Sequence, residues 1–235
     1  MKAIILAGGK GTRLQSVISD IPKPMAPVGS KPFLEYLVLQ LKYWDIKDIV
    51  ISIGYKGEVI KSYFGDGKKW GVTIEYSEEY TPMGTGGAVR EALKYIHNDN
   101  TVVLNGDSFF SADFKELISS HGTNDRFATI ALVHLKNMDR YGMVSFNDKN
   151  EIVSFSEKRG EGAGFINAGI YVLNKKIAAY LPDGPVSLER DVFPKLIWKG
   201  LSGIVQEGFF IDIGIPEDYR YIASNPSLIS VHHER

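Results

Sequence analysis

The sequence predicts an α/β fold in which a mixed, mainly parallel sheet is covered by helices on both faces, as a three-layer sandwich. Short apolar runs typical of buried strands alternate with segments in which apolar residues recur every three or four positions, as in amphipathic helices. Several of the runs in the first half stop at glycine or at Asn-Gly-Asp. Alternating strands and helices usually form a parallel sheet, because each crossover helix returns the chain to the same edge.

These two patterns predict the elements of the first half in order. Apolar and β-branched runs predict strands at residues 3–6, 48–53, 72–76, 101–104 and 127–135. One-sided apolar spacing predicts helices at residues 33–44, 58–64, 88–96 and 114–121. The helix at 33–44 has the clearest pattern, with apolar residues at positions 33, 34, 37, 38, 41 and 44.

Beyond about Asn137 the predicted strands follow one another more closely. They fall at residues 142–146, 152–155, 165–173, 204–206 and 209–213. Helices are predicted at 186–198, with Pro194 inside or at its end, and at 216–223, which starts with proline as helices often do. We expect a single domain over residues 1–235, with a nucleotide-type half over about 1–135 and a half over about 136–235 that completes a substrate pocket.

Composition excludes several classes of partner and site. The 27 Lys and Arg residues nearly balance the 28 Asp and Glu residues, and the net charge of -1 argues against nucleic acid or an anionic membrane as a partner. The absence of cysteine excludes disulfides, thiolate zinc sites, iron–sulfur clusters and a cysteine nucleophile. No apolar stretch approaches the roughly 20 residues of a membrane span, so we expect a cytoplasmic protein.

The loop after the first predicted strand is the strongest local indication of function. It begins at Leu6 and Ala7 and continues as Gly8-Gly9-Lys10-Gly11-Thr12-Arg13. Ligands of open α/β sheets bind beyond the carboxyl ends of strands, and glycines let backbone N–H groups approach a phosphate. The Thr12 hydroxyl and the Arg13 guanidinium match phosphate oxygens. A plain glycine turn with a surface arginine is the structural alternative.

Neither common nucleotide motif describes this loop. A P-loop requires Gly-Lys-Ser/Thr, and a dinucleotide fingerprint requires a third glycine where Leu14 stands. The chain continues instead to Pro22-Lys23-Pro24-Met25. Lys23 lies on a stiff segment close in sequence to the loop, where its charge can neutralise a polyphosphate, although most lysines are simply solvated.

Two aspartates are candidate ligands of Mg²⁺. Asn105-Gly106-Asp107 closes a strand and brings Asp107 to the edge of the sheet, although this tripeptide also favours a turn for its own sake. Asp212 stands among Phe209, Phe210, Ile211 and Ile213, where an unpartnered charge is costly. Mg²⁺ prefers one or two carboxylates together with phosphate oxygens and water, so Asp107 could hold it against phosphates. A metal would also supply the partner that Asp212 needs.

The sequence resembles a known family, the sugar-phosphate nucleotidyltransferases. The resemblance starts with residues 6–14 and the segment 22–25, and it covers nearly the whole chain in the expected order. The further blocks are Gly84-Thr85-Gly86-Gly87-Ala88, Asn105-Gly106-Asp107, Tyr141-Gly142, Ser156-Glu157-Lys158, Ile166-Asn167-Ala168-Gly169-Ile170-Tyr171 and Phe210-Ile211-Asp212-Ile213-Gly214. The resemblance implies a Rossmann-like fold, in agreement with the strand and helix pattern. It also implies transfer of a nucleotidyl group to a sugar 1-phosphate with release of pyrophosphate.

The resemblance assigns roles to individual residues. Asp107 and Asp212 match the metal ligands, with Mg²⁺ as cofactor, and Arg13, Lys23 and Asp107 match the catalytic groups. The nucleotide-binding positions are Leu6, Ala7, Gly8, Gly9, Gly11, Thr12, Arg13, Lys23, Gly84, Thr85, Gly86, Asn105 and Gly106. The positions expected to bind the sugar phosphate are Tyr141, Gly142, Glu157, Lys158, Asn167 and Gly169. From the residues alone, Thr85 is equally a helix cap and Glu157-Lys158 a solvated ion pair.

The resemblance also indicates substrates. Gly84-Thr85-Gly86-Gly87 is more similar to guanylyltransferases than to thymidylyltransferases, in which a glutamine usually occupies this region, so GTP is the expected nucleotide. The string as a whole, including residues 16–21, is most similar to the D-glycero-α-D-manno-heptose 1-phosphate guanylyltransferase subgroup. Ser187-Leu188-Glu189-Arg190-Asp191 also resembles a segment of this subgroup, although it could simply be a charged helix start. A mannose 1-phosphate guanylyltransferase and a uridylyl- or thymidylyltransferase remain alternatives.

Other classes fit the sequence less well. The broken glycine fingerprint disfavours a nicotinamide dehydrogenase, and the presence of Arg13, Lys23, Asp107 and Asp212 disfavours a non-catalytic nucleotide-sugar-sensing subunit. The five histidines show no metal-binding spacing and are expected to be structural or at the surface. The expected partners are GTP and a sugar 1-phosphate, and self-association into a homo-oligomer stays open.

Overall fold

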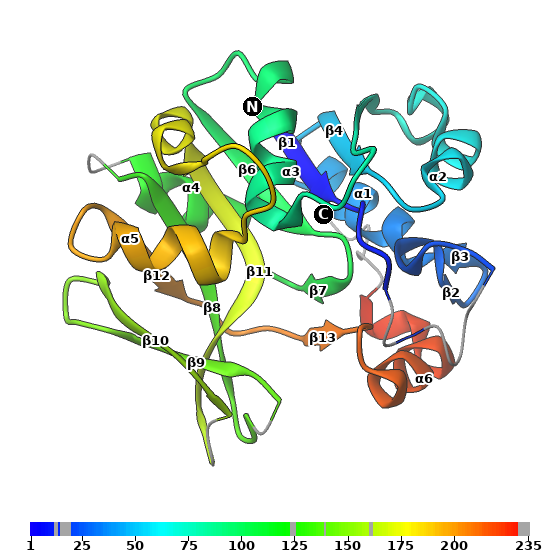
Figure 1. Ribbon diagram of the computed structural model, residues 1–235. Helices are drawn as coiled ribbons and strands as arrows, with labels where there is room; N and C mark the ends of the chain where they lie inside the picture. Colours follow the sequence, from blue (N-terminus) through cyan, green and yellow to red (C-terminus); the bar gives the residue numbers. More distant parts are fainter. Residues whose placement is uncertain (12–13, 15–19, 123–125, 139, 160–161, 230–235) are drawn as a thin grey trace.

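A nine-stranded mixed sheet forms the centre of the molecule (Figure 1). The structure, a computed structural model, describes residues 1–11, 14, 20–122, 126–138, 140–159 and 162–229, with the backbone alone at 156–159. The sheet has the order β10-β9-β11-β6-β1-β4-β5, and β8 and β12 extend it beside β11. These strands are β1 (Lys2–Leu6), β4 (Asp48–Ile53), β5 (Thr73–Glu78), β6 (Asn100–Asn105), β8 (Ala128–Leu135), β9 (Gly142–Phe146), β10 (Ile152–Arg159), β11 (Gly164–Asn174) and β12 (Leu201–Val205).

The nucleotide-type half of the sheet is parallel. β1 pairs with β4 on one side and with β6 on the other, in registers that set Leu6 beside Ser52 and Asn105. β5 continues the parallel pairing beyond β4. Because parallel strands point the same way, β1, β4 and β6 all end at one edge, and the loops that follow them meet there.

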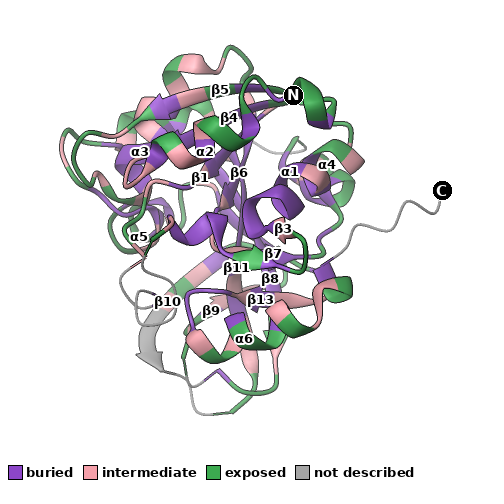
Figure 2. Ribbon diagram, turned by 90° about the vertical axis from the view of Figure 1, so that its right-hand side faces the viewer, coloured by how far each residue is buried: buried purple, intermediate pink, exposed green. Residues whose placement is uncertain are grey.

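Helices cover both faces of the sheet, which explains the near-continuous apolar strands. Successive side chains of a strand point to opposite faces, so Ile5 packs in one core cluster and Ile4 in the other. The Ile5 cluster includes residues of α1 (Phe33–Tyr43), α2 (Gly57–Phe64), α4 (Phe114–Gly122) and α6 (Pro216–Ser224). The Ile4 cluster includes residues of α3 (Gly84–Ala92) and α5 (Phe193–Leu196). Figure 2 shows the buried strands enclosed by helices that carry exposed faces. The predicted three-layer α/β fold is confirmed.

β11 joins the two halves of the chain. It is antiparallel to β6, β8 and β9 in turn, so the same strand borders both the nucleotide-type half and the second half. Its pairing with β8 shifts in register between Asn167 and Tyr171. Gly169 lies inside this irregularity with a φ of 76°, a left-handed conformation that glycine adopts without steric cost.

Two small sheets lie outside the central one. β7 (Ser108–Phe110) pairs antiparallel with β13 (Phe210–Asp212), and Asp212 lies opposite Ser108. β2 (Pro27–Val28) pairs with β3 (Lys31–Pro32) between the first loop and α1. The β7–β13 pairing brings the segment after β6 against a segment near the C-terminal end of the described chain.

The predicted elements agree with the structure except in a few segments. The helix predicted at 186–198 is wrong at both ends, because extended backbone at Ser187 leads into a π-helical turn at Leu188–Val192 and then into the short α5. Pro194 occupies the first turn of α5, where a missing N–H is tolerated. The helix predicted at 88–96 begins earlier, at Gly84, and gives way to a 3₁₀ turn at Leu93–Tyr95. Within the residues described, no helix has the length and apolar character needed to cross a bilayer.

Candidate functional site

A pocket of about 330 Å³ opens where the carboxyl ends of β1 and β6 meet the start of α3. Most of the residues around it belong to the predicted nucleotide-binding blocks. The lining consists of Leu6, Ala7, Gly8, Gly9, Lys10, Gly11, Lys23, Pro24, Glu79, Pro82, Met83, Gly84, Thr85, Ala88, Asn105 and Asp107. The structure therefore brings together three sequence blocks, namely the first glycine loop, the Gly84-Thr85 turn and the Asn105–Asp107 segment.

The glycine loop leaves β1 at Ala7, whose N–H donates to the backbone carbonyl of Ser52 at 2.8 Å. The carbonyl of Gly8 then accepts from the N–H of Tyr55 at 3.2 Å. A Cβ at Gly8 would stand 2.5 Å from Glu79 Oε1, so any larger residue would displace this carboxylate. Two of the predicted phosphate-binding residues, Thr12 and Arg13, lie outside the described residues.

Lys23 is the buried cation of the site. It lies in a 3₁₀ turn at Lys23–Met25, held by the flanking prolines, and its side chain is 7% exposed. Its Nζ donates to Asp107 Oδ2 at 2.6 Å and lies 3.8 Å from Asp212 Oδ1. The predicted lysine and both predicted aspartates therefore meet at one point.

The β7–β13 pair explains how two distant aspartates come together. Asp107 precedes β7 directly, and its carbonyl accepts from the N–H of Ile213 at 2.9 Å. Asp212 ends β13, and its Oδ1 accepts from the N–H of Gly214 at 2.6 Å. Backbone pairing on both sides of the two carboxylates thus fixes their separation independently of any ligand.

The side chains at this point suit a divalent cation whose coordination is completed by phosphate oxygens. Among the residues described, no group of three or more His, Cys, Asp and Glu side chains could hold a metal on its own. Asp107 and Asp212 nevertheless supply two carboxylates around a single ammonium group. Mg²⁺ usually binds through one or two carboxylates, water and substrate phosphates, so these two residues fit it.

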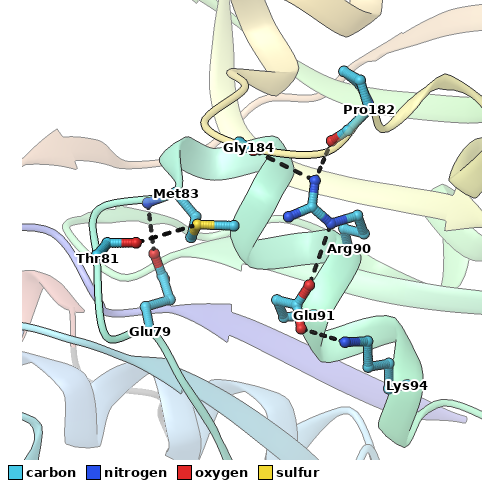
Figure 3. Close-up of polar contacts among 8 residues, drawn as sticks. All are labelled: Glu79, Thr81, Met83, Arg90, Glu91, Lys94, Pro182 and Gly184. Carbon is cyan, nitrogen blue, oxygen red and sulfur yellow. Dashed lines mark hydrogen bonds and ion pairs between the residues drawn. The ribbon is translucent and has the colours of Figure 1, made fainter.

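Glu79 is a site residue that sequence reasoning missed. It follows β5 directly and lines the pocket between the glycine loop and α3. Its Oε1 accepts from the Ser52 hydroxyl at 2.8 Å. Its Oε2 accepts from the N–H of Met83 at 3.2 Å, as Figure 3 shows. These two bonds fix the carboxylate against the end of the sheet and leave lone pairs on both oxygens. A single acidic residue after a strand is too common a feature to be noticed in a sequence.

The glycines at 84, 86 and 87 allow a close approach of the chain around Val186. The carbonyl of Val186 accepts from the N–H groups of Gly86 and Gly87, at 2.8 and 3.2 Å. A Cβ at Gly84 would lie 2.6 Å from the same carbonyl oxygen. Gly84 and Thr85 line the pocket, whereas Gly86 is buried against Val186 and is not among the lining residues. These glycines admit the backbone of the 184–189 segment.

The predicted sugar-side residues are described in part. Asn167 is half-buried, and its Oδ1 accepts from the N–H of Gly169 at 2.8 Å. A Cβ at Gly169 would stand 2.5 Å from Ser108 Oγ, so this strand packs closely on the segment after Asp107. Tyr141 packs edge-on against Phe210, with 5.7 Å between the centroids of the two rings.

The remaining sugar-side residues lie on the β9–β10 ladder. Gly142 is exposed at the start of β9 and pairs with Arg159. The backbone of Glu157 and Lys158 belongs to β10, and their side chains lie outside the described part. Of the predicted sugar-phosphate residues whose side chains the structure describes, none is among the residues lining the pocket.

Glu189 is a second residue with no predicted role. Its carboxylate accepts from Thr85 Oγ1 at 2.6 Å and from the hydroxyl of buried Tyr171 at 3.1 Å. Burial, followed by the charge of Glu189, raises the pKa of Tyr171 well above its ordinary value. The phenol therefore stays protonated and donates to Glu189.

Comparisons with known proteins agree on one family. A family model described as nucleotidyl transferase matches residues 2–226. The chain is similar to the D-glycero-alpha-D-manno-heptose 1-phosphate guanylyltransferases of Aneurinibacillus thermoaerophilus (41% identity; 94% of this chain and 96% of the relative) and Campylobacter jejuni subsp. jejuni serotype O:2 (43% identity; 96% and 100%). It is also similar to the crystal structure of HddC from Yersinia pseudotuberculosis complexed with GMP-PN, with a TM-score of 0.85, 36% identity, and coverage of 95% of this chain and 98% of that one.

Proposed function

We propose that this chain, which belongs to the nucleotidyl transferase family, transfers GMP from GTP to D-glycero-α-D-manno-heptose 1-phosphate. The products are GDP-heptose and pyrophosphate. The observation that carries this proposal is that the glycine loop, Lys23, Asp107 and the Gly84-Thr85 turn line one pocket. The names of the two relatives support the choice of guanine and heptose. A nucleotide-activated sugar is a glycosyl donor, so we further propose that the product serves cell-surface glycan synthesis.

The chemistry requires two anions to meet. An oxygen of the sugar 1-phosphate attacks the α-phosphorus of GTP, the bond to the β-phosphate oxygen breaks, and pyrophosphate leaves with the electron pair. The attacking phosphate is already ionised, so neither a general base nor a covalent intermediate is needed. Catalysis then consists mainly of positioning and charge neutralisation. Lys23 is suited to this role, because its ammonium group is buried at the edge of the pocket.

Asp107 and Asp212 would hold the Mg²⁺ ion. When bound, the ion neutralises charge on the reacting phosphates and orients them. Lys23 keeps the two carboxylates from repelling each other before the substrates arrive, since its ammonium group lies near both. Arg13, in the glycine loop, and Lys158, on β10, supply the remaining positive charge in this proposal, Arg13 toward the triphosphate and Lys158 toward the sugar phosphate.

Glu79 supports guanine as the base. Guanine carries two adjacent donors, its N1–H and its 2-amino group, and a carboxylate is purely an acceptor that can receive both. Uracil and thymine offer one N–H flanked by carbonyl oxygens, which a carboxylate repels. Adenine has a lone pair at N1, which a carboxylate also repels. Because Ser52 and Met83 hold Glu79 in place, the carboxylate is preorganised for this recognition.

A substrate matrix tests the proposed reaction. GTP, ATP, UTP and dTTP are each combined with heptose, mannose and glucose 1-phosphates, and pyrophosphate release is measured. GTP should exceed UTP and dTTP by at least roughly 10²-fold in kcat/KM. Mannose 1-phosphate differs by one exocyclic carbon with its hydroxyl and should cost about 1–3 kcal/mol relative to the heptose. A preference for UTP or dTTP would overturn the base, and a preference for mannose 1-phosphate would overturn the sugar alone.

Inosine triphosphate tests the role of Glu79. It keeps N1–H and lacks the 2-amino group, so the wild-type protein should prefer GTP over ITP by roughly tenfold or more. Glu79→Gln should lower kcat/KM for GTP and reduce this preference. Glu78→Gln is the matched control, because Glu78 pairs with Lys61 at the surface. An unchanged GTP-to-ITP ratio in Glu79→Gln would show that the carboxylate does not read the base.

A further inference from the structure

The carboxylate of Glu189 joins two parts of the site that are distant in the sequence. On one side Thr85 Oγ1, at the start of α3, donates to Oε2 at 2.6 Å. On the other side the Tyr171 hydroxyl, on β11, donates to Oε1 at 3.1 Å. Ser187 Oγ also donates to Oε2, at 2.8 Å. Thr85 lines the nucleotide pocket, and Tyr171 contacts Asn167 of the sugar-side half.

The hydroxyl of Thr85 is committed to this contact. Its single proton is directed to Glu189, and its oxygen accepts from the N–H of Leu188 at 2.9 Å. Thr85 therefore has no proton to offer to a nucleobase or a ribose. Glu189 instead fixes the rotamer of Thr85 and hence the surface that this residue presents to the pocket.

The hydrogen bonds that link Glu189 through Tyr171 to Asn167 have a fixed donor-to-acceptor direction. A carboxylate only accepts, so the Tyr171 hydroxyl must donate to Glu189 and its oxygen must accept from other groups. Asn167 Nδ2 donates to this oxygen at 2.9 Å, and Asn105 Nδ2 approaches it at 3.5 Å. The Oδ1 of Asn167 is then turned toward the N–H of Gly169. The Tyr171 oxygen, whose proton is directed to Glu189, and the N–H of Gly169 thus orient the Asn167 amide together.

The segment that carries Glu189 is fixed to α3 by other bonds. Val186 donates to the carbonyl of Met83 at 2.8 Å and accepts from Gly86. Farther along α3, the Arg90 guanidinium donates to the carbonyls of Pro182 and Gly184 (Figure 3). Removal of the Glu189 charge would therefore alter the hydrogen-bond directions and leave the segment in place.

We propose that Glu189 is a positioning residue that couples the nucleotide side of the site to its sugar side, holding Thr85 through one oxygen and orienting the Asn167 amide through Tyr171 with the other. The inference rests on the proposed function for the identity of the two substrates. Glu189 need not touch either substrate, since it acts through Thr85 and Asn167. Its effect should appear in the Michaelis constants for both the nucleotide and the sugar phosphate.

Three variants separate the contact of Glu189 with Thr85 from its contact with Tyr171. Glu189→Gln is nearly isosteric but brings an NH₂ group, so it cannot accept from both Thr85 and Tyr171 without reversing a bond. It should lower kcat/KM by at least about tenfold, with KM raised for GTP and for the sugar 1-phosphate. Tyr171→Phe should raise KM for the sugar 1-phosphate and leave KM for GTP within about twofold. Thr85→Val should have the opposite selectivity.

A double-mutant cycle distinguishes positioning from a general loss of structure. In the Tyr171→Phe background, Glu189→Gln should have no further effect on KM for the sugar, because the contact with Tyr171 is already broken. Asp191→Ala is the matched control, since Asp191 accepts the N–H of Ser187 in the same turn. It should lower the melting temperature without altering either Michaelis constant. Additive effects in the cycle, or equal kinetic losses in Asp191→Ala, would overturn the proposal.

A spectroscopic readout keeps the inference testable without catalysis. The side-chain amide of Asn167 is assigned in ¹⁵N spectra by its disappearance in Asn167→Asp. Its two proton resonances should shift in Glu189→Gln and in Tyr171→Phe, and should stay in place in Asp191→Ala. Unmoved resonances in Glu189→Gln would overturn the inference whatever the activity. An inactive wild-type protein with shifted resonances would overturn the proposed function alone.

Discussion

The buried ammonium group of Lys23 donates to Asp107 at 2.6 Å, which joins the segment after the glycine loop to the end of β6 at the edge of the pocket. The Asp107 side chain is still 41% exposed, whereas that of Lys23 is 7% exposed. A ligand that enters the pocket therefore meets the carboxylate first and finds the ammonium group fixed behind it. This arrangement makes Asp107 the more direct target for substitution.

Asp107→Asn removes the charge and keeps the size of the side chain. It should reduce kcat by at least about 10²-fold at saturating Mg²⁺, the scale of losing a key electrostatic group, while the protein stays folded. Asp113→Asn is the control, because Asp113 caps the start of α4 through the N–H of Glu116 and asparagine caps equally well. Turnover of Asp107→Asn close to that of the wild type would contradict the assignment.

Gly214→Ala tests the position of Lys23 without changing its charge. A Cβ at Gly214 would collide with Lys23 Nζ and lie 2.7 Å from Asp212 Oδ1, so the flexible lysine end must move away. A shift of about 1 Å in a positioning group can cost on the order of 10²-fold in rate, and we expect at least a tenfold fall in kcat. Gly122→Ala, where a Cβ would meet nothing within 4 Å, should leave kcat unchanged. Equal activities of the two variants would show that Lys23 tolerates displacement.

Arg13→Ala addresses the role that the sequence alone assigns to this residue. If the guanidinium stabilises charge on the departing pyrophosphate, kcat and kcat/KM should fall together, because the interaction strengthens in the transition state. Steady-state kinetics with varied GTP at saturating sugar 1-phosphate measure both constants. A rise in KM at constant kcat would assign Arg13 to binding only.

His121 should make the protein less stable as the pH falls. Burial, followed by the charge of Arg126, lowers the pKa of His121 from 6.5 to about 4, and its Nδ1 lies 2.9 Å from Thr129 Oγ1. The unfolded chain binds a proton at this residue near pH 6.5 and the folded chain near pH 4. The contribution is therefore present above pH 6.5 and is lost progressively between pH 6.5 and 4, by roughly 2–3 kcal/mol in the free energy of unfolding.

Denaturation of His121→Gln measures this contribution. The variant has no titrating ring, so its free energy of unfolding should change less between pH 7 and pH 4.5 than that of the wild type. The difference between the two pH dependences isolates His121 from the other titrating groups. Parallel curves for the two proteins would mean that His121 titrates alike in the folded and unfolded chains.

The sequence predicted most of the central sheet because its strands are buried on both faces. Runs such as residues 49–53 are apolar apart from Ser52, and several of these runs end at loops that form the pocket. β7 was not predicted, since three residues carry no periodicity and the pairing partner, β13, comes from the far end of the chain. The π-helical turn at Leu188–Val192 was also missed, because its apolar spacing resembles that of an ordinary helix.

The same distinction applies to the candidate site. Lys23, Asp107 and the glycine loop lie in recognisable blocks, and the structure brings the described residues of these blocks to one pocket. Glu79 belongs to no such block, and Glu189 lies in the 187–191 segment, whose resemblance gave it no individual role. The significance of both residues depends on contacts such as that between Glu189 and Thr85. Hydrogen bonds between residues that far apart in the chain leave no local pattern.

The pairing of β13 with β7 also determines when the site is completed during synthesis of the chain. Every described residue that lines the pocket is translated by Asp107, whereas Asp212 is translated later. A nascent chain on the ribosome thus contains these residues before it contains the second carboxylate. If Asp212 holds the metal ion as proposed, turnover has to wait until β13 has emerged and paired with β7, and this pairing sets the time at which the site matures.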